Sequence, residues 1–266
     1  MTDTHDPERI RHAGTTPILS YHGTDRAELT LNRPAFHNRL EPGDLATLRE
    51  HIAMLNDDRA VRVVMLTGSG TSTFSSGYHL GAFDAARTDD DTAFEQVANA
   101  IEGMRAATIA RVNGAVYGGA SDLALACDFR IGTHDTRMSV PAARLGLHFY
   151  GSGIRRWVSR VGVNATKRAF LAAQTFSSQE LVACGFLTQA VEATELDAEC
   201  RALIDRLCAL APLAVQGMKR IINAAANAEY DERAAREQCL DSMRSTDFAE
   251  GLAALAAKRP PVFTGA

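Results

Sequence analysis

Residues 113–129, which read NGAVYGGASDLALACDF, constrain the fold more than any other part of the chain. A strand-like segment, residues 108–113, leads into the glycines Gly118 and Gly119, and an apolar helical segment follows near Leu123. A glycine turn that opens a helix leaves backbone N–H groups unpaired beside the positive end of the helix dipole. The pattern therefore predicts a site for negative charge, either a phosphate or the oxyanion of a reacting carbonyl.

Asp122 lies in the first turn of this expected helix. One interpretation is structural, because a carboxylate in the first turn complements the helix dipole where the helix packs on a sheet. The other is chemical, because the carboxylate stands next to the expected oxyanion site and can exchange protons there. The segment alone leaves both interpretations open.

A second glycine turn occurs earlier in the chain. Residues 61–67 (VRVVMLT) form an apolar run without alternation, which is typical of a strand covered on both faces. A glycine- and serine-rich loop follows and leads to Gly77 and Tyr78. Two such turns, each after a strand, are able to direct two N–H groups at one oxygen, as acyl-group chemistry requires.

Several motifs, taken in order, resemble a known family. They are LTLNRPAFHNRL, VVMLTGSG, FSSGYHL, NGAVYGG, DLALACDF and the C-terminal EGLAALAAKRPPVFTG, and together they span residues 29–265. The sequence resembles the crotonase superfamily, the enoyl-CoA hydratase/isomerase family.

The resemblance implies an α/β fold, a crotonase-like spiral of ββα units with a C-terminal α-helical assembly region. It implies a coenzyme A thioester as substrate, no separate cofactor, and a homo-oligomer that is a trimer or a hexamer. The family's two oxyanion-hole amides match Tyr78 and Gly119. The residues that we expect to contact the substrate are Tyr78, His79, Leu80, Gly81, Gly118, Gly119, Ala142 and Phe263.

The catalytic carboxylates of the family match this chain only in part. The first falls on Asp122, which is one methylene shorter than the usual glutamate, and the second falls on Ala142, directly after Pro141. Hydration needs groups that deliver water to one alkene carbon and a proton to the other, and alanine does neither. Hydration by the usual two carboxylates is therefore not expected, whereas Asp122 alone can still move a proton between carbons of an enolate.

His148 and Tyr150 are candidate catalytic residues that compensate for Ala142. Histidine exchanges protons near neutral pH, and a tyrosine hydroxyl donates hydrogen bonds. The structural alternative is that both line the acyl pocket or cap a helix that begins at Ile154.

Three segments describe the expected organisation. Residues 1–16 are expected to form a flexible extension, residues 17–195 the crotonase-like core, and residues 196–266 a helical oligomerisation region. The helices are expected at residues 41–56, 91–105, 165–173, 178–184, 196–210, 212–226, 231–244 and 248–257.

The overall composition excludes several classes of protein. A net charge of −4 and a pI near 6.1, without a basic stripe, argue against a nucleic-acid partner. Five cysteines without CxxC pairs are typical of a reducing compartment, and no metal-binding motif occurs. No secretory signal is visible, and no apolar run reaches the roughly 18 residues that cross a bilayer. We therefore expect a cytoplasmic protein that does not bind membranes.

Three functions remain open from the sequence. The first is an acyl-CoA-transforming enzyme of the hydratase/isomerase type, a lyase or isomerase that stabilises a thioester enolate in an oxyanion hole, with proton transfer by Asp122. The second is an acyl-CoA hydrolase or decarboxylase of the same fold. The third is a non-catalytic CoA-ester-binding subunit.

Overall fold

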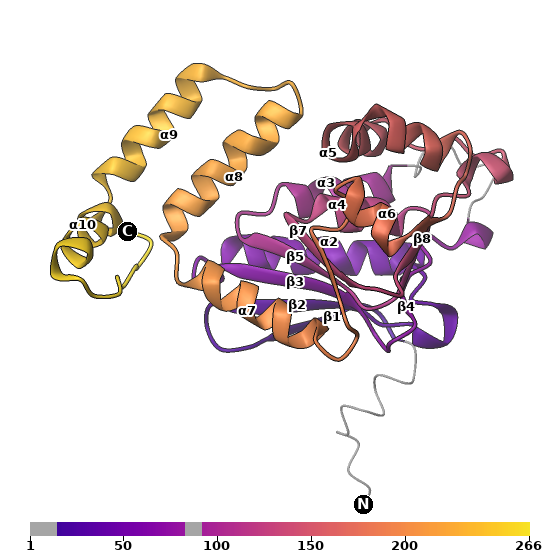
Figure 1. Cartoon of the computed structure of the whole chain (residues 1–266), viewed down its shortest axis with the longest axis horizontal. Coiled ribbons are helices and arrows are strands. Elements are labelled where there is room, and N and C mark those ends of the chain that lie inside the picture. Colours follow the sequence, from indigo (N-terminus) through magenta and orange to yellow (C-terminus); the bar gives the residue numbers. More distant parts are fainter. Residues whose placement is uncertain (1–14, 83–91) are drawn as a thin grey trace, which may run out of the picture.

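A six-stranded sheet forms the centre of the molecule in the computed structural model, which describes residues 15–82 and 92–266 (Figure 1). Its strands, in spatial order, are β1 (Ile18–Tyr21), β2 (Arg26–Leu31), β3 (Val63–Gly68), β5 (Ala107–Val112), β7 (Phe129–Thr133) and β10 (Gln189–Val191). β1 pairs with β2 in antiparallel fashion, and every other neighbouring pair in this sheet is parallel.

A second, smaller sheet lies beside it and explains the repeat of the fold. Its strands, in order, are β4 (Thr73–Ser75), β6 (Ala115–Tyr117), β8 (Arg137–Ser139) and β9 (Phe176–Ser177). Three times the chain passes from a strand of the large sheet to a strand of the small one and then to a helix. The helices after these pairs are α3 (Ala93–Glu102), α4 (Ala120–Ala126) and α5 (Gly151–Phe170). This succession confirms the expected spiral of ββα units.

The large sheet is covered on both faces, as the unbroken apolar run of β3 predicted. One face packs on α2 (Pro42–Asp57), α3 and α4, where Leu66, Val97 and Leu123 belong to one buried cluster. On the other face, Ile109 of β5 packs against Ile204 of α7 (Leu196–Cys208). The central strands are therefore largely buried, and the ends of the strands carry the loops that build the site.

Helix α5 is longer than the helix expected at residues 165–173. It begins at Gly151, and Gly162, with φ +79°, interrupts the helical backbone. Arg156 and Trp157 in its first half are completely buried. A helix that begins at Ile154 was one interpretation of the sequence, but the burial of Arg156 was not expected, because a buried arginine does not read as part of an apolar helix face.

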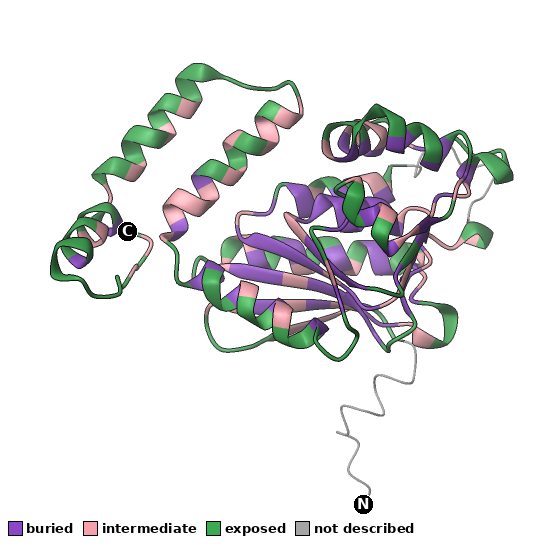
Figure 2. Cartoon of the chain, in the orientation of Figure 1, coloured by how far each residue is buried: buried purple, intermediate pink, exposed green. Residues whose placement is uncertain are grey.

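The C-terminal helices divide into two parts. Helices α7 and α8 (Pro212–Ala226) pack on the core, whereas α9 (Glu232–Arg244) and α10 (Thr246–Ala257) lie away from the sheets (Figure 1). Helix α9 has no buried residue, and most of α9 and α10 is exposed (Figure 2). The α9–α10 arm therefore offers surface for contacts with another chain, as do the exposed apolar side chains of Met218 and Ile222 on α8.

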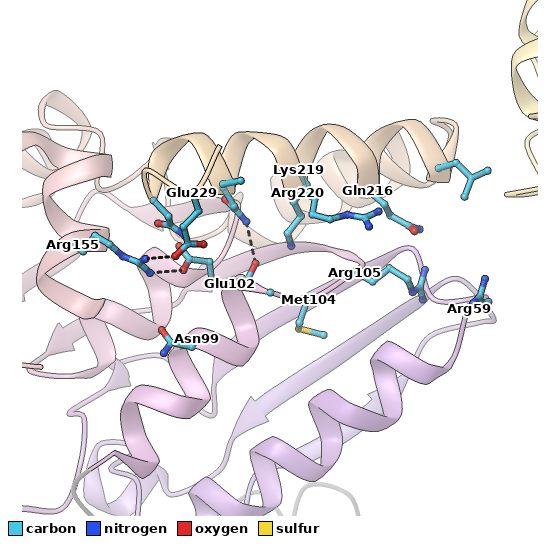
Figure 3. A pocket seen from close by; sticks show the side chains of 15 residues that line it. Arg59, Asn99, Glu102, Met104, Arg105, Arg155, Gln216, Lys219, Arg220 and Glu229 are labelled. Atoms are coloured by element: carbon cyan, nitrogen blue, oxygen red, sulfur yellow. Dashed lines mark hydrogen bonds and ion pairs between the residues drawn. The ribbon is translucent and has the colours of Figure 1, made fainter. Parts of the chain in front are cut away.

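Buried polar contacts hold α8 against the core. Lys219 Nζ lies 2.7 Å from Asp128 Oδ2 and donates to the carbonyl of Ala106 at 2.8 Å. Asn223 Nδ2 donates to the carbonyl of Glu102 at 3.1 Å. A cleft of about 720 Å³ remains between α8 and the ends of α3 and β5 (Figure 3). Side-chain anchors rather than close apolar packing therefore fix the orientation of α8.

We expect Lys219→Ala to lower the free energy of unfolding by roughly 3 kcal/mol, because Asp128 would remain partly buried without its counter-charge. The measurement is chemical denaturation followed by circular dichroism. Arg220→Ala is the matched control, since Arg220 is exposed on the same helix, and it should change stability by less than about 0.5 kcal/mol. Equal effects of the two variants would contradict the assigned role of Lys219.

Candidate functional site

The two glycine turns predicted from separate motifs lie against each other. Gly77 has φ +84° and Gly118 has φ +54°, conformations that glycine adopts without strain. A Cβ added to Gly77 would lie 2.9 Å from the carbonyl oxygen of Tyr117 and 3.0 Å from the backbone nitrogen of Gly119. The absence of a side chain at Gly77 is therefore what allows the two turns to approach.

The backbone of Tyr78 is fixed by a short parallel bridge to Leu40. The amide of Leu40 donates to the carbonyl of Gly77 at 2.8 Å, and the amide of His79 donates to the carbonyl of Leu40 at 2.9 Å. These bonds hold the residues on both sides of Tyr78. The segment around Leu40, just before α2, therefore determines the direction of the Tyr78 amide.

Phe94, near the start of α3, covers the glycine turns. A Cβ added to Gly119 would lie 2.7 Å from two carbons of the Phe94 ring. The ring centroid is 6.2 Å from that of Tyr78 and 6.2 Å from that of Tyr150. The three rings therefore form an apolar wall around Gly119. Sequence reasoning did not identify Phe94, because an apolar residue on an amphipathic helix reads as ordinary core.

Asp122, on the first turn of α4, is completely buried. Its Oδ2 accepts hydrogen bonds from the Tyr150 hydroxyl at 2.7 Å and from Arg156 Nη1 at 2.5 Å. Its Oδ1 is buried and has no hydrogen bond within the described part of the chain. Burial raises the pKa of Asp122, and the adjacent Arg156 guanidinium opposes that rise. The structure thus joins two of the predicted catalytic residues, Asp122 and Tyr150.

Arg156 connects Asp122 to a wider set of buried polar groups. Its Nη2 donates to Asn99 Oδ1 at 2.7 Å and to Glu102 Oε2 at 3.2 Å, both on α3. Glu102 also accepts from Arg160 at 2.9 Å. The two carboxylates raise the pKa of Arg156 further, against the effect of its burial, so it remains a cation. This guanidinium links α3, α4 and α5 around the site. Its role was not predicted from the sequence.

Tyr150 stands at the N-terminus of α5. Its ring stacks on the Phe149 ring, with 4.4 Å between the centroids. Burial, and to a smaller extent the adjacent Asp122 carboxylate, raises the pKa of Tyr150 well above the usual value. The hydroxyl therefore keeps its proton at neutral pH and donates it in the hydrogen bond to Asp122.

A further carboxylate, Glu95, lies close to Tyr150. Its Oε1 accepts a hydrogen bond from the amide of Ser152, in the first turn of α5, at 3.2 Å. The negative charge of Glu95 contributes to the raised pKa of Tyr150. Sequence reasoning missed Glu95, since an acidic residue in the first turn of a helix is an ordinary complement to the helix dipole.

The predicted residues after Tyr78 lie at the edge of the site. His79 is half-buried, and its Nδ1 lies 2.7 Å from Glu41 Oε2 at the N-terminus of α2. Leu80 is exposed, and Gly81 packs against the His79 ring. Their predicted contacts with a substrate remain predictions.

The structure does not bring the remaining predicted residues into the Asp122 network. Ala142 is buried as the first residue of the 3-10 turn Ala142–Leu145. His148 is exposed, and its Nδ1 lies 2.7 Å from the carbonyl of Phe149. The backbone carbonyl of Phe263 accepts a hydrogen bond from Arg62, which directly precedes β3. The loop that leads to Tyr78 leaves from the other end of β3. Within one chain, Phe263 and the glycine turns are therefore at opposite ends of β3.

Residues 15–82 and 92–266 contain no group of three or more His, Cys, Asp or Glu arranged to hold a metal ion. No helix in this part of the chain has the length and hydropathy needed to span a membrane.

We expect Tyr150 to ionise at a pH well above that of an ordinary tyrosine, about 10. Replacement of Asp122 by Asn should lower this pKa, because a neutral amide no longer disfavours the phenolate, while burial keeps it above the ordinary value. NMR titration of the ¹³C-labelled tyrosine rings measures both pKa values, and Tyr150→Phe identifies the resonance. An unchanged Tyr150 pKa in Asp122→Asn would disprove the electrostatic link.

Comparisons with known proteins identify a matching family. The family model for enoyl-CoA hydratase/isomerase matches residues 25–266. The chain is 28% identical over 243 residues to a crotonyl-CoA hydratase of Syntrophomonas wolfei, covering 89% of this chain and 94% of that protein. It is 30% identical over 258 residues to a carnitinyl-CoA dehydratase of Proteus mirabilis, covering 92% and 98%.

The fold also matches solved structures. An enoyl-CoA hydratase/carnithine racemase of Magnetospirillum magneticum superposes with a TM-score of 0.89 at 28% identity, covering 95% of this chain and 96% of that one. An enoyl-CoA hydratase/isomerase family protein of Hyphomonas neptunium superposes with a TM-score of 0.88 at 26% identity, covering 95% and 98%. The matched family model, the relatives and the shared fold lead to one conclusion: the chain belongs to the enoyl-CoA hydratase/isomerase family.

Proposed function

We propose that the protein transforms an acyl-CoA thioester through an enolate held by the backbone N–H groups of Tyr78 and Gly119. The observation that carries this proposal is the close approach of the two glycine turns. A Cβ added to Gly77 would lie only 3.0 Å from the backbone nitrogen of Gly119. Two N–H donors beside one position stabilise the negative charge that develops on a thioester oxygen. The proposed reaction needs no cofactor apart from the coenzyme A of the substrate.

The names of the relatives support this substrate class. One relative is a crotonyl-CoA hydratase and another is a carnitinyl-CoA dehydratase, and both names describe addition or removal of water on a CoA ester. The aromatic wall of Phe94, Tyr78 and Tyr150 offers apolar surface to an acyl group beside Gly119. We therefore place this protein among the lyases or isomerases that act on acyl-CoA.

Proton transfer in this proposal involves Asp122 through Tyr150. Because Asp122 is completely buried and Arg156 occupies its Oδ2, a substrate carbon exchanges protons with the Tyr150 hydroxyl rather than with the carboxylate directly. Asp122 supports that exchange by accepting the hydroxyl hydrogen. A phenol is a far stronger acid than the α-carbon of a thioester, so proton donation from Tyr150 to an enolate is favourable even with a raised pKa.

Hydrolysis or decarboxylation of an acyl-CoA is the second candidate function. Ala142 favours it, because both reactions use an oxyanion hole without needing the carboxylate that position 142 lacks. Mass detection of the products from crotonyl-, 3-enoyl- and malonyl-CoA separates these reactions from hydration and isomerisation. A non-catalytic CoA-ester binder would show none of these products.

The direct test of enolate formation is exchange of the α-protons of butyryl-CoA with D₂O. We expect the wild-type protein to catalyse this exchange, and Asp122→Asn to slow it by about a hundredfold or more, because Tyr150 loses the anion that orients its hydroxyl. Mass spectrometry of the recovered thioester measures the rate.

Asp205→Asn is the control for this experiment, since Asp205 is an exposed acid on α7 on the other face of the sheet. It should leave the exchange rate unchanged. A wild-type protein that binds butyryl-CoA without any exchange would refute the enolate proposal, and full activity in Asp122→Asn would remove Asp122 from it.

We also propose that the α9–α10 arm assembles the chain into a trimer or hexamer. The large apolar residues exposed along the arm and its flanks are Tyr230, Leu240, Met243, Phe248, Leu252, Leu255 and Val262. Exposed apolar side chains gathered on one projecting element are typical of an interface with another chain. In such an assembly the tail of one protomer, with Lys258 and Phe263, would reach the substrate of its neighbour.

Size-exclusion chromatography with light scattering should therefore give a mass of three or six times 28.6 kDa at micromolar concentration. Leu252→Glu combined with Leu255→Glu should shift the protein toward monomer, because two buried charges at an interface are unfavourable. Lys167→Glu, a charge change at an exposed position of α5, is the control. A monomeric wild-type protein would contradict the assembly proposal.

A further inference from the structure

The arrangement around Tyr150 lacks a group that accepts a proton from water. Position 142, where the family has its second carboxylate, is an alanine, and Asp122 is sealed behind Tyr150 and Arg156. Hydration requires one group to activate water and another to protonate the α-carbon. Within the described residues, any replacement must come from a different element that reaches the same space.

Glu95 on α3 meets this requirement by position. The adjacent residue, Phe94, lies directly on Gly119, so this turn of α3 faces the glycine turns. Glu95 Oε1 is 3.2 Å from the amide nitrogen of Ser152, two residues after Tyr150. Its charge acts on the Tyr150 hydroxyl strongly enough to contribute to the rise of that pKa. Glu95 therefore lies at the start of α5, close to the Tyr150 end of the Asp122–Tyr150 pair.

The bonding of Glu95 leaves it free to act as a base. It is half-buried, and in residues 15–82 and 92–266 it forms no ion pair and makes its one hydrogen bond through Oε1. Glu102, two turns further along the same face of α3, differs in this respect because Arg156 and Arg160 pair with it.

Unsatisfied polar atoms mark the same place. Ser152 Oγ and Asp122 Oδ1 are both buried and have no hydrogen-bond partner within the described residues. Buried polar atoms are nearly always paired, with protein, with water or with a ligand. One of these atoms belongs to the carboxylate that Tyr150 contacts and the other lies two residues after Tyr150, and such unpaired atoms are what a site for a water molecule or a polar substrate atom would leave.

We propose that Glu95 is the second acid–base group of this enzyme and replaces the carboxylate that position 142 lacks. The inference rests on the function proposed above. Glu95 takes one proton from water, the water oxygen bonds to the β-carbon of a 2-enoyl-CoA, and the alkene electron pair moves to form the enolate. Tyr150 gives its proton to the α-carbon, and the proton on Glu95 returns to Tyr150. One water is added and nothing else is consumed.

This proposal reverses the expectation drawn from Ala142. Hydration of a short 2-enoyl-CoA becomes an activity of the protein, with the water-activating carboxylate supplied by α3. Glu95→Gln should reduce kcat for crotonyl-CoA hydration by at least about a hundredfold. It should leave the Kd for butyryl-CoA and the thermal unfolding temperature unchanged, because the amide oxygen still accepts from Ser152.

The α-proton exchange of butyryl-CoA separates this inference from the proposed function. Glu95→Gln should retain most of that exchange, which depends on Tyr150 and Asp122, while it loses hydration. Glu50→Gln, an exposed acid on α2, should leave both reactions intact. Glu95→Asp should recover part of the hydration rate, which a merely structural role would not require.

The outcomes are distinct. Wild-type hydration that persists in Glu95→Gln overturns the role of Glu95 and leaves the enolate proposal standing. Wild-type α-exchange without hydration overturns it as well. A wild-type protein without exchange or hydration refutes the enolate proposal, and the role of Glu95 falls with it.

Discussion

The buried guanidinium of Arg156 is the interaction on which the site depends. It lies between Asp122 and Glu102 with no exposure to solvent, and it also holds Asn99. Removing three charged groups from water costs several kcal/mol for each ion, and the close pairing of opposite charges is what makes such burial tolerable. Because its partners belong to α3 and α4 and Arg156 itself to α5, these helices are held in one relative arrangement, and any other arrangement leaves a charge unpaired.

The fixed position of these helices determines what the site is able to do. Arg156 holds Asp122, Asp122 orients Tyr150, and the same placement of α3 brings Phe94 onto Gly119. The buried charges of this network add little to the stability of the fold. They nevertheless determine the geometry of the site, because conformations that leave one of them unpaired are strongly disfavoured. The two glycine turns contribute the complementary feature, a position where backbone approaches backbone because no Cβ stands between them.

The sequence predicted those parts of the fold and site that depend on local chemistry. The glycine turns, the strands before them, the placement of Asp122 on a first helical turn and most helix boundaries follow from backbone conformation and periodicity. Arg156, Glu102 and Glu95 were not predictable in this way. Each reads as an ordinary surface charge on its own helix, and its burial or direction is set by helices that are distant in sequence.

The proposed replacement of the carboxylate at position 142 by Glu95 illustrates why function is less legible than fold in such a chain. An acid–base group is defined by where its oxygen lies relative to the reacting carbons, not by the element that carries it. The first turn of α3 borders the glycine turns through Phe94, whose ring also lies near Tyr150, eight residues after Ala142 in the chain. A carboxylate is therefore able to move from position 142 to the first turn of α3 while the strands, the glycine turns and the Arg156 network stay in place. A missing motif residue thus shows that one position has changed, and only the three-dimensional neighbourhood shows whether the chemistry has changed with it.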